Sequence, residues 1–142
     1  VQNIQHIPNK RFLAKYEALQ IPIGGWILKK LGAIPVDRNR EFSGFPKGYY
    51  VDEMVKMINQ EKEVSLVIAP EGTRNNVPWK TGFHKIAMET GIPVVCVCFD
   101  YVRKRVVISH AFVLTGNLNF DLCAISGWYI KNAPGYVPQL RQ

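Results

Sequence analysis

Apolar residues follow two patterns along the chain, and the two patterns alternate. Short runs rich in β-branched residues, such as 64–69 and 92–99, are typical of strands. Segments in which apolar residues recur every three or four positions are typical of helices. The predicted strands are residues 11–15, 33–36, 64–69, 92–99 and 106–113. The predicted helices are residues 16–20 (a single turn), 26–31, 49–61, 82–90 and 118–131.

The segment 49–61 carries the clearest helical pattern. Val51, Met54, Val55 and Ile58 are spaced so that all four fall on one face of a helix. That face is therefore expected to pack against the core.

Glycine and proline mark the ends of the other helices. Gly32 and Gly91 directly follow two predicted helices and are expected to end them. Residues 21–25, Ile-Pro-Ile-Gly-Gly, are expected to interrupt helical structure between the turn at 16–20 and the helix at 26–31. Within that helix Trp26, Ile27 and Leu28 are expected to pack in the core, in preference to lining an acyl groove or facing a membrane.

Strands that alternate with helices indicate an α/β fold with a mainly parallel central sheet flanked by helices. A chain of 142 residues is expected to form one domain, residues 1–142. Because the sequence opens at Val1, without an initiator methionine, this domain is expected to lack its N-terminal part.

The most distinctive stretch follows the strand predicted at 64–69. Pro70 ends the strand, and the next four residues are a carboxylate, a glycine, a hydroxyl and a guanidinium: Glu71, Gly72, Thr73 and Arg74. Open α/β sheets bind ligands outside the carboxyl ends of their strands. A ligand site is one interpretation of this stretch, and a solvated turn with one surface Glu–Arg pair is the other.

The charge of the chain indicates which kinds of ligand or surface it can bind, and its cysteines indicate their redox state. The net charge is +7, and residues 1–47 hold eight basic against three acidic side chains, whereas residues 101–142 hold five against one. Such basic flanks suit anionic lipid, phosphate ligands or nucleic acid, although Lys29, Lys30 and residues 103–105 are equally expected in solvated turns. Cys96 and Cys98 lie on one face of a strand and are expected to be buried, reduced thiols.

Together, three segments resemble the motifs of the glycerolipid acyltransferases, the lysophosphatidic acid acyltransferases and their relatives. Residues 32–38 (Gly-Ala-Ile-Pro-Val-Asp-Arg) resemble the family's second motif, and residues 70–74 (Pro-Glu-Gly-Thr-Arg) its third. Residues 92–95 (Ile-Pro-Val-Val) resemble the fourth. Two further stretches, 12–15 and 79–83, look like family sequence around these motifs, so the resemblance covers roughly residues 11–115.

The resemblance implies a role for each matching residue. Arg38 and Arg74 would grip the acceptor's phosphate, while Glu71 would act at the catalytic centre by accepting a hydrogen bond from the acceptor hydroxyl or by holding an arginine. The other residues expected to bind substrate are Gly72, Thr73, Lys15, Lys80 and Pro93.

The family's first motif, a histidine followed five positions later by an aspartate, has no match in the chain. His6 is followed at that spacing by Arg11, His84 by Glu89 and His110 by Thr115. The three histidines are therefore expected to be non-catalytic: His6 in a linker, His84 on a helix surface and His110 in a strand. The general base and its aspartate are expected upstream of this sequence.

The activity implied by the resemblance is acyl transfer from acyl-CoA or acyl carrier protein to the hydroxyl of a lysophosphatidate-like acceptor, in phospholipid synthesis. No cofactor and no metal are expected, and the expected location is cytoplasmic, at the inner face of the cell membrane, on an anionic surface. A non-catalytic lipid- or anion-binding member of the same fold is the alternative. Nucleic-acid binding is disfavoured, because the aromatic residues do not interleave with lysine and arginine on one strand.

Overall fold

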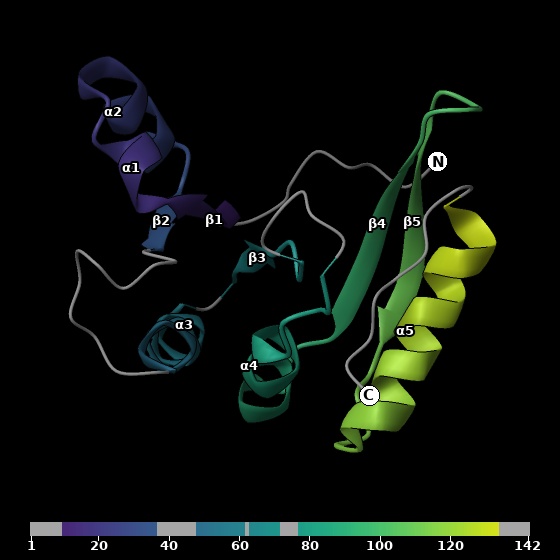
Figure 1. Ribbon diagram of the computed structural model, residues 1–142. Helices are drawn as coiled ribbons and strands as arrows, with labels where there is room; N and C mark the ends of the chain where they lie inside the picture. Colours follow the sequence, from purple (N-terminus) through teal and green to yellow (C-terminus); the bar gives the residue numbers. More distant parts are fainter. Residues whose placement is uncertain (1–9, 37–47, 62, 72–76, 134–142) are drawn as a thin grey trace. The chain divides into compact units, whose positions relative to one another are not determined.

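The computed structural model describes residues 10–36, 48–61, 63–71 and 77–133 (Figure 1). The protein forms two compact units, Val1–Ala69 and Pro70–Gln142. In the described residues each unit contains one β-sheet. The expected mixture of strands and helices is confirmed.

The first unit is built on a three-stranded parallel sheet. Its central strand is β1, which pairs on one side with β2 and on the other with β3. Parallel neighbours need a crossover connection, and the helices of this unit lie between the strands in sequence. The elements are β1 (Lys10–Lys15), α1 (Tyr16–Leu19), α2 (Pro22–Lys30), β2 (Ala33–Val36), α3 (Tyr49–Gln60) and β3 (Ser65–Val67).

Of the predicted break at residues 21–25, only Ile21 is confirmed, because α1 ends at Leu19 and α2 begins at Pro22 and runs through both glycines. Proline is well tolerated in the first turn of a helix, where its missing N–H has no partner to lose. Gly25 is needed for close packing, since a Cβ at this position would collide with the carbonyl oxygen of Leu19. The helix then ends as expected at Gly32, whose φ is 92°.

Core packing was expected for Trp26 and Ile27, and the structure contradicts it for both. Trp26 is 58% exposed and Ile27 is 45% exposed, whereas Leu28 is half-buried. The buried face of α2 is supplied by Gly25 instead, because only a glycine allows the approach to Leu19.

In α3 the predicted face is buried at Met54 and Ile58. The third strand is shorter than the predicted run 64–69 and is not wholly buried, since Val67 is 64% exposed.

The second unit contains an antiparallel hairpin and two helices, one of which, α5, runs along the hairpin (Figure 1). The pairing of β4 with β5 departs from the expected mainly parallel sheet. Only four residues, 101–104, join these strands, and a connection this short cannot carry the chain back to start a parallel strand. The elements are α4 (Gly82–Thr90), β4 (Val94–Asp100), β5 (Arg105–Phe112) and α5 (Leu118–Asn132).

The core of the second unit lies between α5 and one face of the hairpin. Trp79, Cys96, Leu122 and Ile125 form its buried cluster. Cys96 and Cys98 are buried on the same face of β4 and are not disulfide-bonded, as expected. On the other face of the same strand Val95, Val97 and Phe99 are exposed, so β4 buries one face and not two.

Candidate functional site

One predicted site residue, Lys15, lies at the carboxyl end of a strand in the first unit. Lys15 is the last residue of β1 and pairs in register with Val36, the last residue of β2. Since the strands are parallel, both ends lie at the same edge of the sheet, where α/β folds bind ligands. The side chain of Lys15 and all of Arg38, two positions after Val36, lie outside the described residues.

The segment after β3 is held at both ends in the second unit. The backbone N–H of Lys80 donates to the carbonyl of Pro70 at 2.8 Å. The preceding residue, Trp79, is only 2% exposed and packs edge-on against Tyr129, with ring centroids 5.7 Å apart. Glu71 is half-buried and Lys80 is exposed. The structure therefore joins the backbone of Pro70 to that of Lys80, next to a core tryptophan.

Other predicted site residues are placed less fully. Gly72, Thr73 and Arg74 lie outside the described residues. Pro93 is exposed and directly precedes β4. Its role in binding the acyl side stays a prediction.

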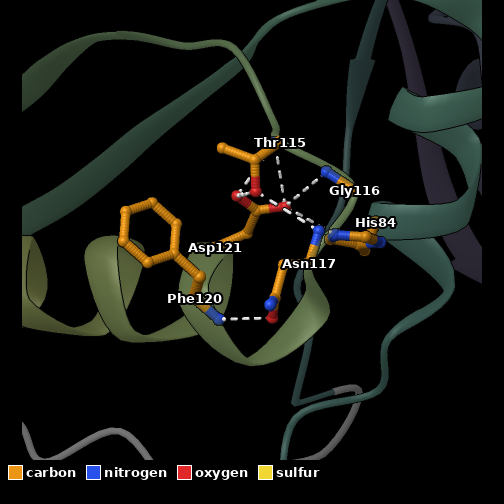
Figure 2. A network of polar contacts seen from close by, with 6 residues as sticks. All are labelled: His84, Thr115, Gly116, Asn117, Phe120 and Asp121. Atoms are coloured by element: carbon orange, nitrogen blue, oxygen red, sulfur yellow. Dashed lines mark hydrogen bonds and ion pairs between the residues drawn. The ribbon is translucent and has the colours of Figure 1, made fainter.

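A buried polar network that the sequence did not predict joins α4 to the start of α5 (Figure 2). His84 Nε2 lies 2.8 Å from Asp121 Oδ2, and the two residues are 8% and 4% exposed. The expectation that His84 lies on a helix surface is therefore wrong. His84 is one of the three buried residues of α4, together with Ile86 and Ala87.

Asp121 accepts three kinds of hydrogen bond besides that contact. The Thr115 hydroxyl lies 2.8 Å from Oδ1, the Thr115 N–H donates to both carboxylate oxygens, and the Gly116 N–H donates to Oδ2 at 3.2 Å. Asn117 caps the same helix by accepting from the N–H of Phe120 at 3.1 Å (Figure 2). The cluster thus ties the loop before α5 to the first turn of that helix.

Burial by itself raises the pKa of Asp121. The hydrogen bonds from the Thr115 N–H, His84, the Thr115 hydroxyl and the Gly116 N–H together hold that pKa below its ordinary value. The ionised carboxylate is therefore stabilised by donors of the protein itself. Because both oxygens are occupied by internal partners in a buried place, the pair is suited to joining elements and not to taking a proton from a substrate.

The sequence contains a signal for the part of this network at the start of α5. An asparagine before an apolar residue, with an acid in the following turn, is typical of a helix N-terminus, and Asn117 and Asp121 fit it. Nothing local indicates that the partner of Asp121 lies 37 residues earlier, at His84.

Of the other histidines, His110 lies in β5, as expected, and stacks on Phe112 with ring centroids 4.4 Å apart. His6 lies outside the described residues.

Among residues 10–36, 48–61, 63–71 and 77–133, no three His, Cys, Asp or Glu side chains are grouped to hold a metal ion. The helices in that part of the chain do not include one with the length and apolar character needed to cross a membrane.

A protein-family model matches more than half of the chain. The family model described as Acyltransferase matches residues 2–100, a range that contains every residue predicted to bind substrate.

Curated relatives point the same way. The chain is 34% identical over 89 residues to a chloroplastic 1-acyl-sn-glycerol-3-phosphate acyltransferase of Brassica napus, over 60% of this chain and 24% of that protein. A 1-acyl-sn-glycerol-3-phosphate acyltransferase of Limnanthes alba is 31% identical over 58% of this chain and 30% of its own length. One from Salmonella typhimurium is 28% identical over 66% and 38%. The chain thus covers between 24% and 38% of these relatives, and no solved structure matches it.

Proposed function

The chain belongs to the acyltransferase family, and on that premise we propose that the protein transfers a fatty acyl group to the free hydroxyl of a lysophosphatidate-like acceptor. The single observation that carries the proposal is the family match over residues 2–100, which spans all the predicted substrate-binding positions. The names of the curated relatives support an acylglycerol phosphate as the acceptor class. The proposed acyl donor is the thioester of acyl-CoA or of acyl carrier protein.

In the proposed reaction the acceptor hydroxyl oxygen attacks the carbonyl carbon of the thioester. The new C–O bond forms and the C–S bond breaks, while the hydroxyl proton passes to a general base, which then gives it to the departing thiolate so that the carrier leaves as a thiol. The proposed base is a histidine oriented by an aspartate, supplied from outside residues 1–142, because no histidine of this sequence has an aspartate five positions later. The 142 residues are in this proposal the substrate-binding part of one larger acyltransferase domain, in which a central sheet is flanked by helices.

Positioning is the proposed task of the residues in this chain. Arg38 and Arg74 are proposed to bind the acceptor phosphate, since a guanidinium can donate two parallel hydrogen bonds to it. Glu71 is proposed to accept a hydrogen bond from the acceptor hydroxyl or to hold an arginine in place. Lys15 and Lys80 are proposed to add positive field, and the location of Lys15 at the carboxyl edge of the sheet supports this.

A peripheral location on the cytoplasmic face of the membrane is part of the proposal. It is supported by the exposed apolar side chains of α2, where Ile23 is 76% and Trp26 is 58% exposed. The ammonium of Lys30 lies 4.1 Å from the centroid of the Trp26 ring. Tryptophan beside lysine is the combination found at membrane–water interfaces.

The test is two-substrate kinetics on a protein that contains this chain and a His-x4-Asp segment before it. Arg74→Ala removes a charge-assisted contact to phosphate, which is worth about 1.5–3 kcal/mol. We expect kcat/KM for lysophosphatidate to fall by roughly tenfold to a hundredfold, with the donor constants little changed. Arg74→Lys keeps the charge but loses the two-pronged geometry, so it should restore only part of the loss.

A monoacylglycerol without phosphate is the matched control acceptor, and Arg74→Ala should affect it little. Unchanged lysophosphatidate kinetics in Arg74→Ala would refute the assigned phosphate contact. A protein that binds lysophosphatidate but releases no thiol would instead fit the non-catalytic member of the same fold.

A further inference from the structure

We propose that the tip of the β4–β5 hairpin, residues 99–106, docks on the surface of an anionic phospholipid bilayer. The inference rests on the proposed function at a membrane and names a surface for it in the second unit. It is carried by the side chains that this tip exposes and by the way its charges are fixed.

The tip exposes an unusual amount of apolar surface for its length. Phe99 is 62%, Tyr101 85%, Val102 78% and Val106 55% exposed. Phe99 and Val106 are paired across the two strands, so they share a face of the hairpin. The rings of Phe99 and Tyr101 lie with centroids 6.3 Å apart. Removing this surface from water favours docking, and tyrosine is enriched at the headgroup level of bilayers.

Cations are interleaved with these apolar side chains. Arg103, Lys104 and Arg105 form the turn, and the one carboxylate within residues 99–106 is Asp100. The Asp100 side chain is fully buried, whereas those of Arg103 and Arg105 are 60% and 55% exposed. The turn therefore presents positive charge to solvent and keeps its negative charge beneath, which complements an anionic lipid surface.

Asp100 also fixes the shape of the turn. Its Oδ1 accepts from the N–H of Arg103 at 3.0 Å, and its Oδ2 accepts from the two guanidiniums at 3.2 Å and 3.1 Å. Lys104 has a φ of 51°, the left-handed conformation that tight turns use. The arginines are thus held in place before any lipid is met, which lowers the entropy lost on docking.

The two ends of the hairpin differ in charge, and this difference distinguishes docking on anionic lipid from non-specific apolar adsorption. Its opposite end carries Val113, which is 84% exposed, but no lysine or arginine occurs between Arg105 and Lys131. An exposed apolar residue without neighbouring cations gains nothing from anionic lipid. Val113 and Lys85 therefore offer matched controls within the same unit, because Lys85 lies on α4 beside His84, whose partner is at the start of α5, away from the tip.

The experiment is co-sedimentation of the full chain with vesicles of phosphatidylcholine alone and of phosphatidylcholine with phosphatidylglycerol, at low and high salt. Lys104→Glu exchanges a positive for a negative charge and should weaken binding to the anionic vesicles roughly tenfold or more at low salt. Tyr101→Ser combined with Val102→Ser should weaken binding at both salt concentrations. Val113→Ser and Lys85→Glu should leave binding within about twofold of the wild type.

Circular dichroism of each variant separates lost binding from lost folding, and the milder Lys104→Gln replaces Lys104→Glu if the latter unfolds. Wild-type binding by both tip variants, or equal weakening by the controls, would overturn the proposal. Because the assay measures no chemical step, a protein inactive in acyl transfer that still shows this pattern would overturn the proposed function alone.

Discussion

Two aspartates of the second unit are almost fully buried, and they do opposite things with their charge. Asp121 is 4% exposed and is surrounded by neutral donors of Thr115 and Gly116 and by the buried His84. Asp100 is 1% exposed and pairs with Arg103 and Arg105, whose side chains reach solvent.

The pKa of each carboxyl lies below its ordinary value, for different reasons. At Asp100 the N–H of Arg103 contributes most, burial opposes it, and the two guanidiniums add to the lowering. At Asp121 burial is the largest influence and raises the pKa, and the hydrogen bonds more than offset it. Asp100 holds two positively charged side chains at the surface, whereas Asp121 joins buried donors inside the unit.

The difference between the two aspartates bears on how a polar cluster is interpreted. A buried histidine and aspartate at 2.8 Å resemble a catalytic pair, but every oxygen of Asp121 is occupied by an internal donor. Removing one member should therefore cost stability. Removing Asp100 should instead change what the surface presents.

Asp121→Ala should give the largest effect. It leaves the donors of Thr115, Gly116 and His84 without their acceptor in a buried place, and the loss in free energy of unfolding should be about 3 kcal/mol. Urea denaturation measures it. Glu89→Ala, at an exposed acid 3.6 Å from Lys85, is the control and should stay within about 0.5 kcal/mol. A loss at Asp121 no larger than that would contradict the structural role.

His84→Ala should cost less than Asp121→Ala, because it removes only one of the partners. In a double-mutant cycle the two changes should be coupled by about 1 kcal/mol, since both remove the same contact. Additive losses would show that the two side chains act independently of one another.

The acid limb of the stability curve should depend on Asp121. Its folded pKa lies below the ordinary value of about 3.9, so the unfolded state binds more protons in this range and stability rises with pH. The contribution is complete above about pH 5 and is lost as the pH falls through the folded pKa. Asp121→Asn should lose less stability than the wild type between pH 5 and acid pH (about 2). Identical acid limbs for the two proteins would argue against the network.

Asp100→Asn should give the smallest change in unfolding free energy of the aspartate substitutions. When the ion pairs of Asp100 are lost, the guanidiniums of Arg103 and Arg105 remain exposed to water, so no charged group is left buried without a partner. Urea denaturation beside Asp121→Asn makes the comparison direct. A larger loss for Asp100→Asn would reverse the roles assigned to the two carboxylates.

Local pattern predicted much of this fold. The spacing of Met54 and Ile58 located the buried face of α3, and Gly91, with a φ of 69°, ends α4 where expected. Alternation along β4 placed Cys96 and Cys98 on one face. Such features depend on neighbours in the sequence, and a single sequence therefore carries them.

Several sequence predictions were wrong because they depend on contacts that form only in the folded structure. The glycine at position 25 suggested a break, but its absent side chain is what lets α2 approach Leu19. The antiparallel pairing of β4 with β5 is a different failure, because the short connection between the two apolar runs is visible in the sequence itself and excludes a parallel pair. The partner of His84 lies on another helix, beyond the reach of any spacing rule.

The resemblance to the acyltransferase family was readable in the same way. Residues 70–74 stand out because a strand-length apolar run ends at a proline directly before charged residues. The ligand of these residues stays a prediction, which the two-substrate kinetics of Arg74→Ala test.

The central claim is that this chain supplies substrate-binding residues and not the general base. Release of thiol from an acyl thioester, with lysophosphatidate present, tests it on residues 1–142 alone and on the protein extended by a His-x4-Asp segment. General-base catalysis is worth about 10²–10⁴-fold, so the 142 residues alone should release no thiol above background and the extended protein should be active. Robust release by residues 1–142, abolished by His84→Ala in a variant that still folds, would contradict the account.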